Sequence, residues 1–420
     1  MMSKLFTPYK LGNLELRNRT IRSAAFEAMC KNNRPTQELF DYHTAVARGG
    51  IGMTTVAYAA VCESGLSFDS QLLLCKEIIP DLKKLTDAIH AEGAKASIQL
   101  GHCGNMTHRS TCHCMPIGAS NGFNLYSPTF YRKMTKEDIE YVAKSFGDAT
   151  RICIEAGFDA VEVHAGHGYL ISQFLSPYTN HRKDEFGGSL DNRMRFMRMC
   201  ISEVVKAAGD KIAVTAKLNT SDGFKGGQTT EELIEVAKEL RKLGVQAITL
   251  SGGFVSRAPM YVMRGEFPVK TIVHYFPWKQ WWLKLGVLLG GRIVAPTVPF
   301  KPLFFLEDAK KFQAAMPGFP FIYVGGVTSR EAADKVMDEG FELLQMGRAV
   351  LEDTDFVNKM AADEHHCSAC EHSNFCVGRM YSRSMQCHKR CVDITPALEK
   401  EVEKVNARND RRERELGYKK

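Results

Sequence analysis

Eight short apolar runs alternate with longer segments of helical periodicity along most of this chain, and this alternation limits the fold more than any other feature. Between most of the runs apolar residues recur at helical spacing, as in Pro80 to Ala91 and Thr229 to Leu243. Strands that alternate with helices in this way are typical of a parallel α/β sheet. The runs begin near Thr20, Gly52, Lys95, Asp159, Ile212, Gln246, Phe321 and Glu342.

A closed barrel suits these segments better than an open, doubly wound sheet. No G-x-G-x-x-G pattern follows the first run, as a dinucleotide-binding half of an open sheet would require. Residues Leu5 to Leu16, with a turn at Gly12 and Asn13, predict a short hairpin that closes the bottom of the barrel. With 420 residues and 44% hydrophobic content, the chain can bury a core of this size. The predicted fold class is therefore α/β, a (β/α)8 TIM barrel with an N-terminal hairpin.

Residues 254–306 replace the short connection expected after the sixth strand with an aromatic-rich insertion that holds all 3 tryptophans. Lysines, glycines and prolines break its apolar runs, which fall short of the roughly 18 to 20 residues that cross a bilayer. Three interpretations stay open: a lid over the mouth of the barrel, a surface for forming an oligomer, and a helix in peripheral contact with a membrane. The lid is favoured, because the insertion leaves a strand end on the face where barrels build active sites. The long segment Gly101 to Met134 is likewise expected to be a lid or binding loop.

The barrel is expected to span residues 1–366, and a cysteine-rich segment, 367–391, follows it. Its cysteines are spaced C-x2-C-x5-C-x10-C-x3-C, with His372 and His388 among them and His365 and His366 just before, a density that usually indicates a metal site in an intracellular protein. Zinc, an iron–sulfur cluster and no metal all stay open. Residues 392–420 form a charged tail that we expect to be helical. The candidate metal ligands are Cys367, Cys370, Cys376 and Cys387.

Composition and the N-terminus narrow the class of protein further. The formal net charge of +7 is modest for this length and draws on the charged tail, so we predict no nucleic-acid partner. The first ten residues contain no apolar stretch of the kind that starts a secretion signal, so we expect a cytoplasmic protein. The cysteines outside the C-terminal cluster are scattered through predicted core elements and are interpreted as reduced, buried thiols.

Three side chains that can handle protons, His164, His167 and Tyr169, follow the fourth strand candidate directly. At the carboxyl end of a barrel strand all three would point into the mouth where such folds carry out their chemistry. The H-x-x-H pair could instead bind a metal, as in barrel hydrolases. The other strand ends, however, carry Gln99, Lys217, Ser251 and Gly325 where further acidic or histidine ligands would be needed, so acid–base chemistry is favoured.

The stretch Gly157 to Phe196 resembles the signature of the Old Yellow Enzyme family of FMN-dependent oxidoreductases. It contains H-x-x-H-G-Y-L, then F-L-S-P and N-x-R-x-D-x-F-G-G-S, and finally N-R. The resemblance implies FMN as cofactor and NAD(P)H as hydride donor. It also implies reduction of the C=C bond of an α,β-unsaturated carbonyl substrate. In this interpretation His164 and His167 bind the carbonyl oxygen, and Tyr169 delivers a proton to carbon.

The same resemblance, together with the chemistry of flavins, assigns the cofactor-binding residues. Lys217 stands where the family usually has arginine and would place a cation near the N1/O2 edge of the flavin. Gln99 matches the family glutamine that bonds the pyrimidine edge. The first strand departs from the family. Ala24, Ala25 and Phe26 can contact the flavin through their backbone, but they include no cysteine that could adjust its reduction potential. Two strand-end turns would hold the phosphate through Gly325, Gly326, Gly347 and Arg348.

Other functions remain open on sequence grounds. Larger relatives of the 2,4-dienoyl-CoA reductase and trimethylamine dehydrogenase kind hold a [4Fe-4S] cluster at similarly spaced cysteines, which makes an FMN/iron–sulfur oxidoreductase the alternative enzyme. A flavin- or metal-binding protein without turnover is the alternative of another class. The aromatic insertion favours a bulky, apolar substrate, such as a steroid-like enone. Neither the preference for NADH or NADPH nor the oligomeric state follows from the sequence.

Overall fold

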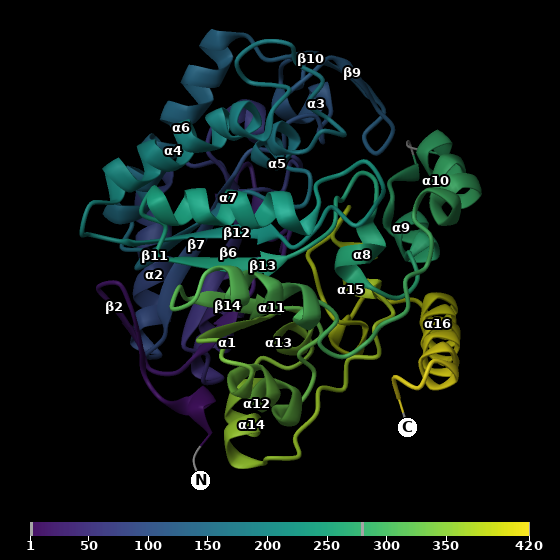
Figure 1. Cartoon of the computed structure of the whole chain (residues 1–420). Helices are drawn as coiled ribbons and strands as arrows, with labels where there is room; N and C mark the ends of the chain where they lie inside the picture. The colour runs from purple at the N-terminus through teal and green to yellow at the C-terminus, as the bar shows by residue number, and fades with distance from the viewer. Residues whose placement is uncertain (1–2, 279–280, 420) are drawn as a thin grey trace.

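The computed structural model describes residues 3–278 and 281–419, and eight parallel strands close into a barrel at its centre. Each of the eight predicted strands is present, and the predicted (β/α)8 fold is confirmed (Figure 1). Parallel pairing runs continuously round the barrel from β11 to β7. In chain order the barrel strands are β3 (Thr20–Arg22), β6 (Met53–Ala60), β7 (Lys95–Gly101), β11 (Ala160–His164), β12 (Ala213–Asn219), β13 (Ala247–Ser251), β14 (Phe321–Val324) and β15 (Leu343–Met346).

Amphipathic helices surround the strands and bury one face each against them (Figure 1). Several begin at the caps that their sequences provide, since Thr135 bonds the backbone N–H of Asp138 and Thr229 that of Glu232. The segments predicted to be helical near Pro80 and Thr229 form the helices α2 and α7. The surrounding helices are α1 (Gln37–Arg48), α2 (Ile79–Ala91), α4 (Lys136–Glu155), α5 (Leu170–Leu175), α6 (Leu190–Ala208), α7 (Thr230–Lys242), α11 (Leu306–Ala315), α12 (Arg330–Asp338), α13 (Arg348–Glu352) and α14 (Phe356–Ala362).

A hairpin of β1 (Tyr9–Leu11) and β2 (Leu14–Leu16) closes the amino-terminal end of the barrel. Its leucines form a buried cluster with the first inward side chains of the strands, such as Ile21, Ala160 and Leu343. Gly12, with φ of 58°, adopts the left-handed conformation that this tight turn requires. The bottom of the barrel is therefore apolar and filled, and the polar strand ends lie at the opposite face.

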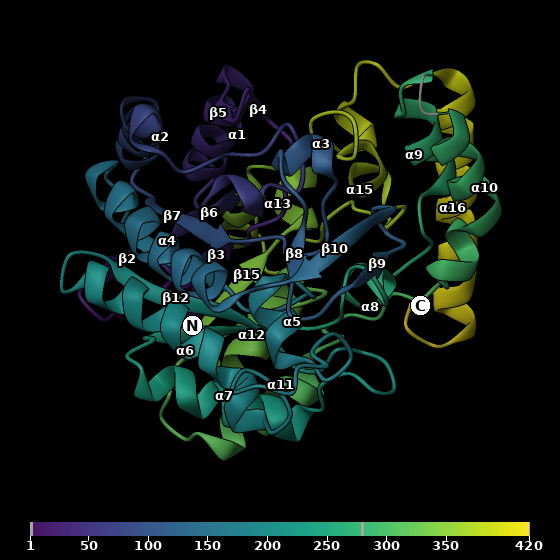
Figure 2. The same ribbon diagram turned by 90° about the horizontal axis from the view of Figure 1, so that it is seen from above.

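Three additions lie beyond the plain barrel. Residues 101–134 carry α3 (Arg109–Cys112) and a small sheet of β8 (Ile117–Gly118), β9 (Gly122–Asn124) and β10 (Thr129–Lys133). The insertion carries α8 (Pro259–Met263), α9 (Val269–Tyr275) and α10 (Trp281–Val294). The C-terminal part carries α15 (Phe375–Arg379) and α16 (Pro396–Glu415). Figure 2 shows α9, α10 and α16 side by side on one flank of the barrel, where α9 contacts both of the others.

Candidate active site

A cavity with about 1400 Å³ of empty volume lies at the carboxyl ends of the barrel strands. Parallel strands bring their carboxyl ends to one face, so residues that are far apart in sequence meet there. Insertion residues Val262, Phe300 and Phe304 line it as well. All twelve residues proposed from the sequence to act in catalysis or to bind FMN also line this cavity: Ala24, Ala25, Phe26, Gln99, His164, His167, Tyr169, Lys217, Gly325, Gly326, Gly347 and Arg348.

His164, His167 and Tyr169 pack against one another in this cavity. The ring of His164 lies 4.4 Å from that of Tyr169 and 5.1 Å from that of His167, measured between centroids. The backbone N–H of Gly166 donates to Nδ1 of His164 at 3.4 Å, so the neutral imidazole carries its proton on Nε2. Nε2 of His167 lies 2.7 Å from Oγ of Ser251. If the serine hydroxyl donates there, the N–H that His167 can offer to a ligand is at Nδ1.

The backbone around His167 is held in an unusual conformation. His167 has φ of 59°, in the left-handed region, and its N–H donates to Oδ1 of Asn219 at 2.9 Å. Gly168 follows with φ of 79°, and an added Cβ would lie 2.4 Å from the ring of Phe254. Strained backbone of this kind often marks functional sites, and here it turns the chain so that His164 and Tyr169 face the same space.

The electrostatics of the cavity keep these groups uncharged at neutral pH. Burial holds the pKa of His164 well below its ordinary value, with the charges of His167 and Lys217 adding to the effect. Burial, followed by Lys217, lowers the pKa of His167 to about 3. Burial raises the pKa of Tyr169. Two neutral imidazoles and a protonated phenol therefore face the cavity, a set that can donate hydrogen bonds and a proton.

Lys217 already has a carboxylate partner in the folded chain. Its Nζ lies 3.0 Å from Oε1 of Glu162, and both side chains are almost completely buried. Burial by itself would raise the pKa of Glu162, but Lys217 and hydrogen bonds from Gln345 and Thr249 lower it. The amide of Gln99 donates to the same carboxylate at 2.7 Å. Lys217 and Gln99 are thus fixed by a carboxylate that was not among the predicted site residues.

The opposite end of the cavity is lined by glycines and Arg348. Gly325 and Gly326 have φ of 131° and 73°, and an added Cβ at Gly326 would lie 2.7 Å from the backbone nitrogen of Leu303. An added Cβ at Gly347, just before α13, would meet no heavy atom within 4 Å. Arg348 donates to Oδ1 of Asn374 at 3.1 Å. Backbone at this end is open to the cavity beside a cation, which suits an anionic group.

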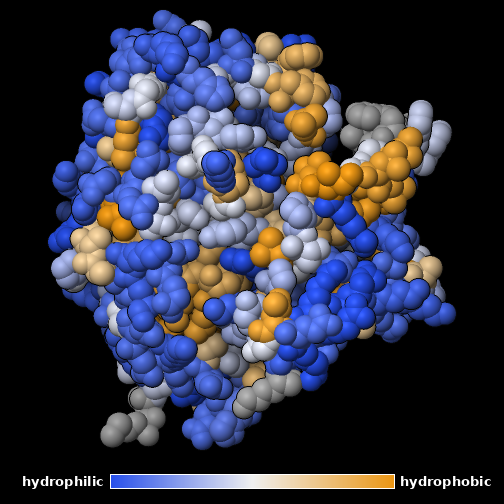
Figure 3. Space-filling model, turned by 45° about the vertical axis from the view of Figure 1, so that its right-hand side comes forward, coloured by the Kyte–Doolittle hydropathy of each residue, from blue (hydrophilic) through white to orange (hydrophobic). Residues whose placement is uncertain are grey.

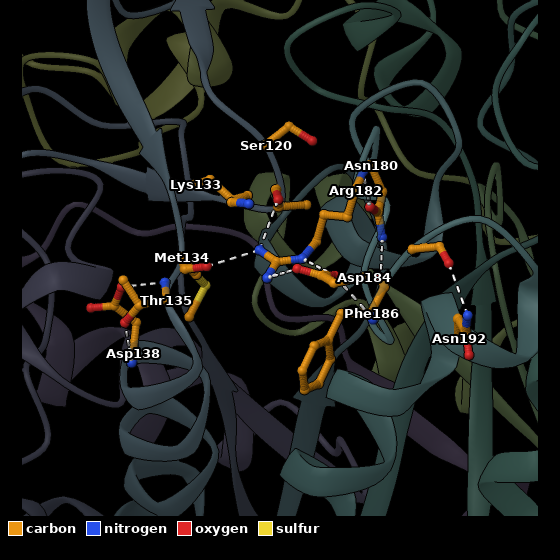
Figure 4. A network of polar contacts seen from close by, with 12 residues as sticks. Ser120, Lys133, Met134, Thr135, Asp138, Asn180, Arg182, Asp184, Phe186 and Asn192 are labelled. Atoms are coloured by element: carbon orange, nitrogen blue, oxygen red, sulfur yellow. Dashed lines mark hydrogen bonds and ion pairs between the residues drawn. The ribbon is translucent and has the colours of Figure 1, made fainter.

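The part of the family signature that follows β11, from Phe174 to Arg193, mainly stabilises the fold. Arg182 is buried and forms a bidentate pair with Asp184, at 2.8 and 2.7 Å. It also donates to the carbonyl oxygen of Met134, at 2.8 Å, and thereby joins this segment to the one that ends the 101–134 addition (Figure 4). Asn180 donates to the carbonyl oxygens of Phe174 and Phe186, at 2.7 and 2.8 Å. These contacts fix the loop that carries Tyr169 without entering the cavity.

The cysteine-rich segment lies against the cavity. Cys370, Cys376 and Cys387 line one small neighbouring cavity, and Cys370 and Cys376 also line the main one. Cys367 is exposed. In residues 3–278 and 281–419, no group of three or more His, Cys, Asp or Glu side chains is placed so that it could hold a metal ion. The metal site therefore stays a prediction.

The cavity has glycine-lined backbone beside a cation at one end and hydrogen-bond donors and an acid at the other, which suits a barrel enzyme with a phosphorylated cofactor. Residues 4–279 match the NADH:flavin oxidoreductase / NADH oxidase family, and the chain belongs to that family. The resemblance to Old Yellow Enzyme noted in the sequence is confirmed at this level.

Individual relatives differ in how much of their length this chain matches. The 4,4'-dithiodibutanoate disulfide reductase of Rhodococcus erythropolis is 37% identical over 392 residues, which cover 92% of this chain and 94% of that protein. A 2-naphthoyl-CoA reductase complex has a TM-score of 0.79 at 24% identity, over 96% of this chain and 58% of that one. The old yellow enzyme homologue from Zymomonas mobilis has a TM-score of 0.68 at 20% identity, over 91% of this chain and 97% of that one. The two structures show the shared barrel fold.

Proposed function

We propose that this chain is an FMN-dependent oxidoreductase that uses NAD(P)H to reduce the C=C bond of a bulky, apolar α,β-unsaturated carbonyl compound. The observation that carries the proposal is the packing of neutral His164, neutral His167 and protonated Tyr169 around one cavity. Phe300 and Phe304 line the same cavity and favour an apolar substrate. The 13 free cysteines suit a cytoplasmic enzyme.

Several residues fit FMN in this cavity. Gly325, Gly326, Gly347 and Arg348 would hold the phosphate through backbone N–H groups and a guanidinium. Oε1 of Gln345 is buried without a hydrogen-bond partner in the described structure, and Gln345 lines the cavity. An acceptor left unpaired inside a protein is costly, and the N–H of a flavin pyrimidine would satisfy it. Gln99 and Lys217 would lie along the same polar edge, as proposed from the sequence.

The residues of the chain would divide the chemistry as follows. FMN, when bound, would supply the hydride for the carbon β to the carbonyl group. His164, through Nε2–H, and His167 donate hydrogen bonds to the carbonyl oxygen and stabilise the negative charge that develops there. Tyr169 delivers a proton to the α-carbon, because its raised pKa keeps the phenol protonated at neutral pH. The product is the saturated carbonyl compound.

A disulfide is the second candidate substrate. The observation that favours it is the 37% identity to a 4,4'-dithiodibutanoate disulfide reductase over 94% of that protein. Hydride would add to one sulfur, the S–S bond would break, and the second sulfur would leave as a thiolate that takes a proton. His164 and Tyr169 are as well placed to stabilise and protonate a thiolate as an enolate.

A comparison of the rates at which the two substrates reoxidise the flavin tests the proposal. Purified protein is reduced anaerobically with NADH or NADPH and then mixed with 2-cyclohexenone or with 4,4'-dithiodibutanoate, and reappearance of oxidised flavin is followed. Faster reoxidation by the enone supports the first proposal, and faster reoxidation by the disulfide replaces it with the second. Reoxidation by neither would contradict both. Iron and zinc analysis of the same sample tests the predicted cysteine site.

A further inference from the structure

The helix α10 presents an apolar stripe to solvent on the flank of the molecule. Trp281, Leu285, Leu288, Leu289 and Ile293 recur at helical spacing, and they are 65%, 49%, 52%, 71% and 82% exposed. Figure 3 shows hydrophobic surface gathered over α10 at the upper right of that view. Side chains of this size are normally covered, and an exposed contiguous patch of them indicates an interaction surface.

The opposite side of the helix packs on the protein. An added Cβ at Gly291 would lie 3.0 Å from the side chain of Val269, so α10 and α9 approach closely there. α9 in turn contacts α15 and α16, which fixes α10 to the barrel through the C-terminal part (Figure 2). Neither Trp278 nor Trp281 is among the residues that line the active-site cavity. The ends of the insertion reach the cavity, while α10 faces outward.

The charges around the stripe favour an anionic surface. Residues 267–306 contain five lysines or arginines and no aspartate or glutamate, although the whole chain carries 48 acidic residues in 420. Arg292 lies on α10, is 61% exposed and pairs at 3.4 Å with the buried carboxylate of Glu266, which Arg408 and Arg412 also bind. Three arginines share that one carboxylate, so the group stays positive, and Lys284 lies one turn after Trp281. Lys270 is neutralised by Glu401, at 2.7 Å. Tryptophan beside leucine and lysine is the composition of helices that lie in the headgroup region of a bilayer.

A second copy of the chain fits this surface less well. A two-fold contact would place the segment against itself, and therefore bring Lys284 and Arg292 of one copy near those of the other. Residues 267–306 contain no carboxylate to offset that repulsion, and the neighbouring Glu266 is already shared among Arg292, Arg408 and Arg412. A bilayer crossing is also excluded for α10, because its 14 residues extend only about 21 Å. No helix in the described part of the chain is long and apolar enough to span a membrane.

We propose that α10 docks the enzyme on the surface of an anionic phospholipid bilayer, with the Trp281 to Ile293 stripe in the headgroup region. The proposal does not depend on the substrate, because it rests on a face that lies outside the cavity. Docking would leave the barrel in water and would be reversible and weakened by salt.

Vesicle sedimentation of the full-length protein tests this docking. Vesicles of phosphatidylcholine alone are compared with vesicles of phosphatidylcholine and phosphatidylglycerol in equal parts, at low and high salt. We expect wild-type protein to sediment with the anionic vesicles at low salt, and the double variant Leu285→Glu, Leu289→Glu to lose at least about tenfold in partitioning. Tyr141→Glu, on an exposed side chain of α4, is the matched control and should bind like wild type, because α4 lies on the opposite side of the barrel from α10 (Figures 1 and 2).

The oligomeric state distinguishes membrane docking from self-association through the same stripe. Sedimentation velocity without vesicles is measured for wild type and for the double variant, and circular dichroism checks that both are folded. A dimer that the double substitution dissociates would overturn the proposal in favour of self-association. So would wild-type protein that ignores anionic vesicles at low salt, or a double variant that binds them as well as wild type does.

Discussion

At the scale of single residues, the pairing of Lys217 with Glu162 changes what the lysine does. Without the structure, Lys217 is an isolated cation that needs the flavin as its counter-ion. In the folded chain the carboxylate of Glu162 neutralises it and accepts from Gln99, Thr249 and Gln345 as well. A network satisfied by so many donors rigidifies the centre of the barrel and fixes Gln99 and Lys217 before any cofactor binds.

Removing the charge of Glu162 should therefore act on stability and on the flavin together. Glu162→Gln leaves Lys217 buried beside a neutral amide, and we expect a loss of about 3 kcal/mol in the free energy of unfolding. Because reduced flavin carries negative charge, the unpaired lysine should favour it and shift the reduction potential to a more positive value. Urea unfolding and dye-linked redox titration measure the two effects. Thr249→Val, which removes a hydrogen bond without a charge, is the control, and an unchanged potential in Glu162→Gln would refute the coupling.

At the scale of elements, the segment between α5 and α6 explains why a signature extends well beyond the residues that face the cavity. Arg182 joins this segment to the end of the 101–134 addition, and Ser189 caps α6. The strand β11 ends at His164, and Tyr169 directly precedes α5, so the position of both depends on what holds the following loop. The signature residues outside the cavity are thus positioning residues.

Arg182→Lys tests that role. A lysine ammonium cannot pair with both oxygens of Asp184 and also reach the carbonyl oxygens of Ala119 and Met134, so buried acceptors lose their partners. We expect the free energy of unfolding to fall by about 2 to 3 kcal/mol. Arg195→Lys on the exposed face of α6 should change it by less than about 0.5 kcal/mol. Equal urea midpoints for the two variants would show that the Arg182 contacts contribute little.

At the scale of the whole molecule, the sequence predicted the barrel well and the cavity in part. Strand positions follow from local apolar patterns, so all eight starts and the hairpin could be found. Glu162 was missed although it lies two residues before His164, on the same inward face of an otherwise apolar strand, which was a usable signal. The approach of Phe300 and Cys376 to the cavity had no such signal. It depends on how the insertion and the C-terminal part pack on the barrel, which no local pattern specifies.

Buried neutral histidines should make the whole fold sensitive to acid. Burial lowers the pKa of His102 and of His167 to about 3, whereas both would titrate near 6.5 in the unfolded chain. Between these values the unfolded state binds more protons, so each histidine's contribution is present above about pH 6.5 and is lost as the pH falls towards 3. Within that window, each histidine should lower the free energy of unfolding by about 1.4 kcal/mol for every unit by which the pH falls.

Urea unfolding at pH 7 and pH 5 measures this effect. His102 accepts from the N–H of Gly104 and lies 3.0 Å from Oγ of Ser64, so glutamine can keep polar contacts there without titrating. We expect His102→Gln to lose less stability than wild type between the two pH values. The same loss in both would mean that His102 is not held neutral by the fold.

We propose that this cavity holds flavin against a substrate that His164 binds and Tyr169 protonates. Anaerobic stopped-flow measurement of flavin reduction by NAD(P)H and of flavin reoxidation by 2-cyclohexenone tests it most directly, in wild type, His164→Ala and Tyr169→Phe. We expect bound FMN in all three proteins and near-normal flavin reduction by NAD(P)H. Reoxidation by the enone should be about 100-fold slower in His164→Ala, as for loss of an oxyanion donor. Tyr169→Phe should slow reoxidation by the enone but not by oxygen. Protein without flavin, or variants that are reoxidised by the enone as fast as wild type, would contradict it.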